Sequence, residues 1–264
     1  MAIKEKKDEQ ISILALKRGK ATFHIIGTTP LLMNRFSEKA KQQLLAPPPR
    51  KNAAERSATL KHDPIAEYRA SVYLNRDPNR KARVHAPSEW FKSALANAAL
   101  DIPGAAKAKL ERLVQVSPQI DLFGTPRLHF GMVRSADMNR TPDVRCRAVF
   151  SEWACSFDVS YIATLIKAND ISNLVAAAGE IVGCGDWRPQ KGGTYGQFRI
   201  AERDDPDFRR IVETQGTEAQ VEALANPVSY DAETEELLVW FMSYARDREM
   251  KVTGAEIIQQ IAAE

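Results

Sequence analysis

The stretch of residues 179–200, GEIVGCGDWRPQKGGTYGQFRI, most constrains how this chain can fold. It ends a helical pattern, crosses a loop rich in glycine, and resumes as an alternating strand. The loop interleaves its glycines with Trp187, Arg188, Lys191 and Tyr195. Glycines let backbone amides and flat side chains approach a ligand closely, as phosphate or nucleobase binding requires. These four residues are therefore candidates for nucleic-acid contact; the alternative is that the tryptophan fills the core and the glycines only shape a turn.

The charge of the chain is distributed unevenly. Residues 201–264 carry 6 basic and 15 acidic residues, a balance of −9, whereas residues 1–200 carry 31 and 19, a balance of +12. A basic body predicts a polyanionic partner such as a nucleic acid, and an acidic segment predicts a separate role. The alternative is that both charge sets are solvated surface.

The cysteines and the apolar runs exclude several classes of protein. Three cysteines in no CxxC pair predict neither a disulfide framework nor a zinc site. No window approaches the roughly 20 apolar residues of a membrane span, and the Lys-rich start lacks the apolar region of a signal peptide. We therefore expect a cytoplasmic protein with no membrane partner, no metal and no other cofactor.

Periodicity divides the chain into three parts. Residues 1–20 form a charged arm, residues 21–200 a core with an insertion at about 35–83, and residues 201–264 an acidic helical tail. The predicted core contains a strand at 21–26, a helix after Pro87, strand-forming runs at 114–123, 127–133, 144–151 and 153–161, a helix over 171–182 and a strand at 197–200. Short helices are predicted in the insertion at 37–45 and around 65–68, and in the tail at 217–225 and 234–249.

Without the insertion and the tail, the order of elements is strand, helix, strands, helix, strand. This is the order of a ferredoxin-like βαββαβ unit, so the predicted class is α+β with an RRM-like core. In the RNA-recognition version of that fold, an open sheet face and its loops contact single-stranded RNA.

Three stretches resemble the RAMP superfamily of CRISPR-associated proteins. They are TTPLL at residues 28–32, HAPSEWFKSAL at residues 85–95, and the glycine-rich loop before the last strand. The similarity is greatest to backbone subunits of Cascade-type complexes or to a phage-encoded relative. Two positions depart from the family pattern, since residues 86–89 read APSE where the family usually carries Gly and Ser, and Asn97 falls near the family's Arg.

The resemblance implies a function for the whole chain. It implies a non-catalytic protein that binds single-stranded RNA and assembles in multiple copies along it. The partners would be RNA, further copies of this chain in an oligomer or filament, and other subunits of a ribonucleoprotein.

Three further groups of residues are candidates for nucleic-acid binding. His85, Ser88 and Lys92 lie at a predicted helix start, where free amides and the helix dipole attract an anion. A predicted hairpin that could grip a phosphate backbone carries Arg134, Arg140, Arg145 and Arg147. Arg35 and Lys39 open the insertion and could reach a nucleic-acid strand or a neighbouring subunit. The alternatives are an ordinary helix cap, a solvated edge strand and a charged surface helix.

Catalytic motifs are missing from the sequence. The four histidines are dispersed, with no HExxH motif and no nucleophile elbow, so no catalytic residue is assigned. Two other functions remain open. One is a metal-independent ribonuclease of the RAMP type that uses His24 or His85 in general acid-base catalysis. The other is a single-stranded DNA-binding recombination protein of a phage or mobile element.

Overall fold

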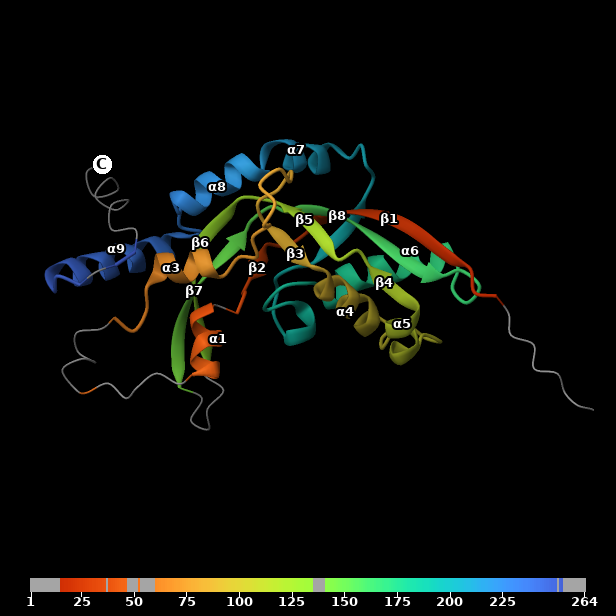
Figure 1. The fold of residues 1–264 in the computed structure, drawn as a ribbon, viewed down its shortest axis with the longest axis horizontal. Coiled ribbons are helices and arrows are strands. Elements are labelled where there is room, and N and C mark those ends of the chain that lie inside the picture. Colours follow the sequence, from red (N-terminus) through yellow and green to blue (C-terminus); the bar gives the residue numbers. More distant parts are fainter. Residues whose placement is uncertain are drawn as a thin grey trace, which may run out of the picture.

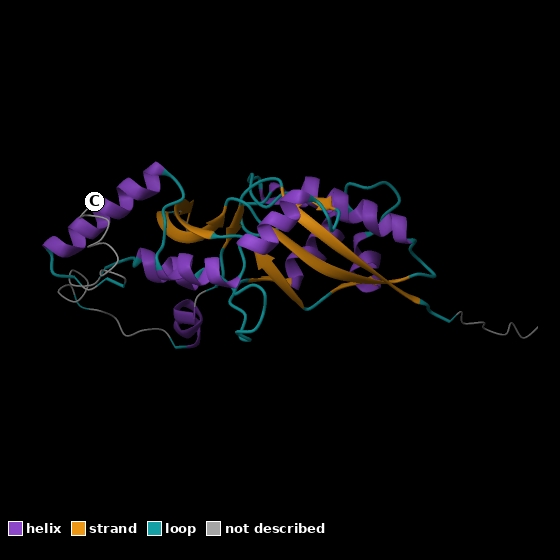
Figure 2. Cartoon of the chain, turned by 90° about the horizontal axis from the view of Figure 1, so that it is seen from above, coloured by secondary structure: helices purple, strands orange, loops and turns teal. Residues whose placement is uncertain are grey.

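The computed structural model describes residues 15–36, 38–46, 52, 60–134, 141–250 and 252–253. Two antiparallel sheets and their flanking helices form an elongated molecule, with the sheets following one another along its long axis (Figures 1 and 2). Helices and antiparallel strands make this an α+β protein, as the sequence predicted.

The larger sheet has the strand order β3-β5-β8-β1-β9, with β4 also paired to β8. Neighbouring strands are antiparallel throughout. The strands are β1 (Arg18–Gly27), β3 (His85–Pro87), β4 (Val114–Val116), β5 (Gln119–Phe123), β8 (Ala154–Ile162) and β9 (Phe198–Ala201). The first core strand is therefore longer than predicted, and the predicted run at 114–123 is divided into β4 and β5.

The side chains of β1 alternate between the two faces of the larger sheet, so the strand contributes to the packing on both faces. Phe23 and Ile25 are buried in the principal core. This face packs against α4 (Ser88–Ala98) and α6 (Ala168–Ala177), which continues into a π-helical turn, η1 (Ala178–Val182). One side of α5 (Lys107–Leu113) also packs against the principal core. Both long helices occupy the regions predicted for them.

The opposite face of the larger sheet is covered at one end by α7 (Pro206–Thr214), a helix that the sequence reading missed. Phe208 of α7 packs with Ile26 in a second, smaller cluster of buried residues. The rings of His24 and Phe208 lie 5.0 Å apart. This half of the sheet face is therefore closed to any large ligand.

The smaller sheet has the strand order β2-β7-β6. Its strands are β2 (Leu31–Met33), β6 (Pro126–Arg134) and β7 (Pro142–Phe150), and α1 (Glu38–Leu45) and α3 (Pro64–Ala70) come from the insertion. The predicted hairpin is confirmed, because β6 pairs with β7, but it lies in a separate sheet and not among the core strands with which the sequence pattern grouped it. Periodicity reports which residues alternate, but not which strands pair.

Other segments hydrogen-bond to β7 near and beyond the short strand β2, and to the outer edge of β6. The backbone amides of Cys146 and Ala148 on β7 donate to the side chains of Glu67 in α3 and of Ser71, which follows that helix. On the far edge, the segment at residues 228–230 exchanges backbone hydrogen bonds with Leu128. Capped edges protect a small sheet from pairing with foreign strands.

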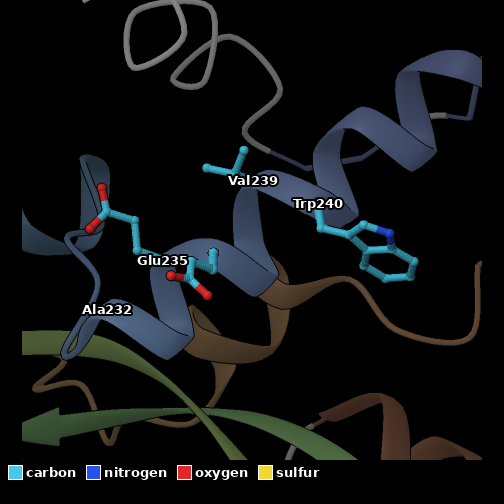
Figure 3. Close-up of a pocket in the computed structure, with 5 residues that line it drawn as sticks. Ala232, Glu235, Val239 and Trp240 are labelled. Carbon is cyan, nitrogen blue, oxygen red and sulfur yellow. The ribbon is translucent and has the colours of Figure 1, made fainter.

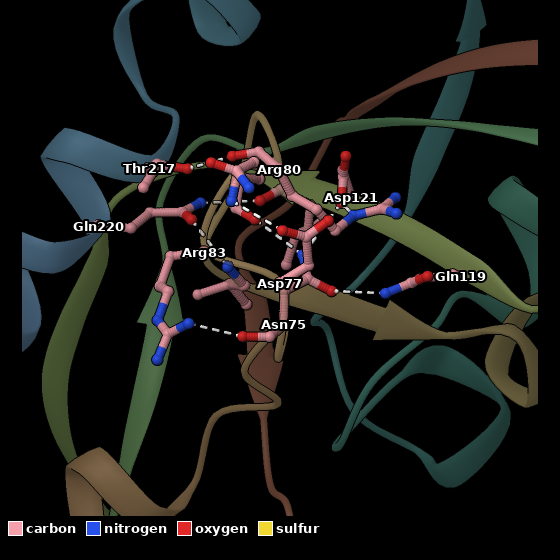
Figure 4. Close-up of polar contacts among 12 residues, drawn as sticks. Asn75, Asp77, Arg80, Arg83, Gln119, Asp121, Thr217 and Gln220 are labelled. Atoms are coloured by element: carbon pink, nitrogen blue, oxygen red, sulfur yellow. Dashed lines mark hydrogen bonds and ion pairs between the residues drawn. The ribbon is translucent and has the colours of Figure 1, made fainter.

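The C-terminal helices α8 (Thr217–Ala225) and α9 (Ala232–Asp247) correspond to the two helices predicted in the acidic tail. Figure 4 shows Thr217 and Gln220 of α8 beside the loop that carries Arg80 and Arg83. Thr217 Oγ1 donates to the carbonyl of Arg80, and Gln220 Oε1 accepts from the amide of Val84. The acidic segment is thus bound to the folded body up to the end of α9.

One buried cluster joins the two sheets. It contains Phe91 and Phe157, whose rings stack at 4.6 Å, together with Leu31 and Leu128 of the smaller sheet. Trp153 is fully buried at the junction, and its indole Nε1 donates to the carbonyl of Thr29 at 2.9 Å. Within the part of the chain that the structure describes, no helix combines the length and apolarity needed to span a membrane.

Candidate nucleic-acid interface

The glycine-rich loop at residues 183–197 is fastened to the turn that follows β1. The amide of Thr28 donates to the carbonyl of Gln197, and the amide of Gln197 donates to Thr29 Oγ1. Further along, the amide of Asp186 donates to the carbonyl of Leu32, which makes an isolated antiparallel bridge to β2. Two of the stretches that carry the family resemblance are therefore hydrogen-bonded to each other.

Most glycines of this loop serve its own packing. A Cβ at Gly196, where φ is +76°, would lie 1.8 Å from the carbonyl oxygen of Cys184. A Cβ at Gly193 would lie 1.7 Å from the carbonyl oxygen of Trp187. Gly192 differs, because nothing lies within 4 Å of its Cβ position. Close approach to a ligand is open only at this tip, beside the exposed Lys191.

Trp187 has a left-handed backbone, with φ of 51°, and its side chain is 48% exposed. A non-glycine residue in this region costs on the order of 1 to 3 kcal/mol and persists only where its surroundings fix it. The amide of Trp187 donates to Asp186 Oδ1, and its carbonyl accepts from the amide of Tyr195. The loop thus holds a large aromatic side chain half in solvent, and Trp187 does not fill the core.

An ion pair joins the loop to the β6–β7 hairpin. Arg147 Nη1 on β7 donates to Asp186 Oδ2 at 2.6 Å, and Asn34 Nδ2 donates to the same oxygen at 3.1 Å. The Arg147 side chain is 4% exposed, and burial lowers its pKa while Asp186 opposes that shift. Gly131, across the hairpin, makes room for it, because a Cβ there would lie 2.5 Å from Arg147 Nη2. Arg147 therefore positions the loop and is not exposed to a ligand.

Beside this ion pair lies a polar cluster that the sequence reading did not identify. Burial raises the pKa of Tyr195, and the other groups that act on it electrostatically are Tyr230, Asp231 and Arg147. His129 on β6 places Nδ1 3.3 Å from Asp231 Oδ2 and its ring edge against Tyr230. One feature of the sequence could have indicated this cluster. Asp231 is a favourable N-cap residue, and its bond to the amide of Thr234 fixes residues 230–231 at the start of α9.

The exposed cations of the hairpin and loop are Arg127, Arg134, Arg145 and Lys191. Arg145 lies two residues from Arg147 on β7, so both project from the same face, and its nearest carboxylate oxygen, on Asp143, is 3.3 Å away. Arg127, which was not predicted, shares the face of His129 by the same alternation. Arg140 lies outside the described residues.

Arg188 is held inside the loop. Its Nη1 donates to the carbonyl of Gly185, and its Nε and Nη2 donate to Gln190 Oε1. These bonds engage three of the guanidinium nitrogens within the loop, so fewer of its N–H groups are free for other contacts.

The three residues predicted to bind an anion at the start of α4 each have their own local surroundings. His85 packs against the ring of Tyr73, with ring centroids 5.6 Å apart, and Lys92 Nζ donates to Gln115 Oε1 at 2.9 Å. Ser88 begins the helix, and no side chain caps it. Among the described residues, no hydrogen bond or ion pair links these three residues to one another.

The two residues predicted at the start of the insertion have a local role where they are described. Arg35 forms an ion pair with Glu38 in the first turn of α1, and its amide donates to the carbonyl of Ser71. Lys39 lies in α1, and its side chain is outside the described part.

The two histidines considered for general acid-base catalysis, His24 and His85, have different local surroundings. His24 Nδ1 lies 2.7 Å from Ser156 Oγ, and Nδ1 of His85 is buried with no hydrogen-bond partner among the described residues. Burial lowers the pKa of His85, with Asp121 opposing the shift. Within the described ranges, no group of three or more His, Cys, Asp or Glu side chains has an arrangement that could hold a metal ion.

Comparison of the sequence with models of protein families and with curated proteins finds no match.

Proposed function

We propose that this chain is a non-catalytic protein that binds single-stranded nucleic acid, with RNA as its first ligand, and assembles in multiple copies along the strand. The observation that carries the proposal is Trp187, a half-exposed aromatic residue in a loop that an ion pair joins to the basic face of a hairpin. Aromatic platforms beside cations bind single strands without sequence preference, because each base has a face for stacking and each nucleotide a phosphate.

The arrangement of the larger sheet supports a ferredoxin-like core of the RAMP type. Taken in chain order, β1, α4, β5, β8, α6 and β9 give a βαββαβ unit. The first and third of these strands, β1 and β8, lie in the centre of the sheet, and the second and fourth flank them. In this interpretation the β6–β7 hairpin is an insertion between the second and third strands of the unit.

The open sheet face is a poorer binding surface than the loop and the hairpin. RNA-recognition sheets stack bases on aromatic side chains of their strands. Here the uncovered part of that face offers small polar and charged side chains, with Thr22 donating to Asp158 and Lys20 paired to Asp158 at 2.8 Å. The rest lies under α7. Stacking is therefore assigned to Trp187 and charge neutralisation to the exposed cations of the loop and the hairpin.

Binding of a short labelled RNA, long enough for one copy, tests the site by fluorescence anisotropy. Trp187→Ala should weaken binding by about 5- to 150-fold, the equivalent of the 1 to 3 kcal/mol that stacking on one base contributes. Trp240→Ala is the matched control, because Trp240 is also exposed but lies on α9. Lys191→Ala should weaken binding and reduce its salt dependence by one counterion.

Several outcomes would overturn the proposal. Binding that is indifferent to salt, or equal for RNA and a neutral polymer, would exclude an electrostatic strand-binding surface. Equal losses for Trp187→Ala and Trp240→Ala would exclude this loop. Matched DNA and RNA oligomers decide between the two sugars, and cleaved RNA recovered from reactions with a chelator would favour the ribonuclease alternative.

A further inference from the structure

The outer face of α9 is apolar and acidic at once. Leu237, Val239 and Trp240 are 41%, 54% and 61% exposed, and Glu235 and Glu236 lie among them. Figure 3 shows Glu235, Val239 and Trp240 around a shallow hollow on this helix. Exposed apolar side chains gathered on one helix indicate a surface that binds a partner.

An apolar groove lies between α5 and α6. It has a volume of about 320 Å³ and an apolar lining that includes Ile102, Leu110, Leu165 and Leu174. Leu165 is 52% exposed at its mouth, and the charged residues that line the groove are the cation Lys109 and the anion Asp170. The groove therefore offers an apolar floor to a bulky side chain.

The charges around the two surfaces are complementary. Around the groove, α5 and the start of α6 carry the cations Lys107, Lys109, Arg112 and Lys167 and the anions Glu111 and Asp170. The first half of α9 and its cap carry Asp231, Glu233, Glu235 and Glu236, with no cation before Arg246. Such a pair of surfaces attracts over a distance and disfavours like-with-like pairing.

The two surfaces lie toward opposite ends of the molecule, with α9 at one end of the long axis and α5 and α6 toward the other (Figure 1). They cannot meet within one chain, but they can meet between copies. A contact between two different surfaces is head-to-tail, and it extends into a chain of subunits unless its rotation closes a ring.

We propose that α9 of one copy docks into the α5–α6 groove of the next copy, with Trp240 as the anchor. This contact joins successive copies in the multi-copy assembly. It rests on the proposed function only for the statement that the assembly lies along a nucleic acid.

The test uses two variants, each blocked at one surface. Trp240→Ala removes the anchor, and Leu165→Asp places a charge at the mouth of the groove. Sedimentation of the full chain without nucleic acid should show concentration-dependent growth for the unaltered protein. Each variant should lose at least about 30-fold in self-association constant, the factor for an anchor contributing about 2 kcal/mol. Mixed one to one, the variants should form a dimer and nothing larger, because one intact α9 and one intact groove remain.

Matched controls are Trp187→Ala and Leu45→Asp, which alter exposed residues elsewhere and should associate like the unaltered chain. An unaltered chain that stays monomeric both free and on long RNA would overturn the inference. So would a Leu165→Asp variant that associates normally, which would indicate α9 pairing with itself. Binding of short RNA by the Trp240→Ala variant separates the two proposals. If only the docking contact is lost, this variant still binds short RNA. If the proposed function is wrong, neither the unaltered chain nor any variant binds it.

Discussion

At the scale of single residues, the candidate interface depends on Arg147, which is almost fully buried and paired to Asp186. Its Nε is buried with no hydrogen-bond partner among the described residues, so the ion pair with Asp186 is the chief compensation for burying the charge. A buried cation without its partner is strongly destabilising, whereas replacing both partners by neutral groups costs much less. The residue thus makes the position of the loop sensitive to one side chain.

We therefore predict that Asp186→Asn lowers the free energy of unfolding by about 1 to 3 kcal/mol, because the Arg147 charge stays buried without a counter-charge. The double variant Arg147→Met with Asp186→Asn should recover much of that loss. Urea unfolding of the four proteins in the cycle measures both effects. Additive losses would show that the two side chains act independently.

At the scale of elements, α8 is hydrogen-bonded to backbone groups of the larger sheet and its neighbouring loops through one buried side chain. Gln220 is fully buried, and its amide group bonds the amide of Val84 and the carbonyls of Leu122 and Gly124. One side chain from the acidic segment thus satisfies backbone groups of two core segments. Such groups have no access to water once buried, so losing their partner carries the full desolvation cost.

Gln220→Ala should accordingly lower the free energy of unfolding by about 2 to 4 kcal/mol, with at least two buried backbone groups left unsatisfied. Glu218→Ala is the control on the same helix, because Glu218 is exposed. Its expected effect is a few tenths of a kcal/mol, from the helix dipole. Chemical denaturation measures the free energy of unfolding of both variants, and equal losses would contradict this stabilising role of Gln220.

At the scale of the whole molecule, one core joins both sheets, so we expect them to unfold together. Each sheet contains a histidine whose pKa is lowered in the folded protein. Burial is the main cause that lowers the pKa of His85 on β3 and of His129 on β6, with Asp121 and Asp231 respectively opposing the shift. Their titration is thus linked to the same global transition.

The sign of the pH dependence follows from these directions. An unfolded histidine has a pKa of about 6.5, so below that pH the unfolded chain binds more protons than the folded chain. The free energy of unfolding should therefore fall as the pH drops from about 7.5 toward 5.5, by at most about 1.4 kcal/mol per pH unit for each histidine. His85→Gln and His129→Gln should each flatten the slope in urea titrations. Unchanged slopes in both would disprove the linkage.

The predictions from sequence succeeded where local pattern is sufficient. Apolar residues at helical spacing predicted α4, α6, α8 and α9. Gly183, with φ of +70°, ends the helical segment before the loop. The sequence also identified Trp187 as a residue of interest within the loop. It could not assign the partner of Arg147, because Asp186 is 39 residues away and nothing local links them.

By itself, then, the sequence determined the α+β class, most element positions and the charge asymmetry, since these depend on periodicity and composition. Only the tertiary structure decided that β6 and β7 form a separate sheet, that α7 covers one sheet face, and that Arg147 holds the loop instead of facing solvent. The physical reason is that strand pairing and burial of charge are set by contacts between distant segments, and alternation along a strand is compatible with several such pairings.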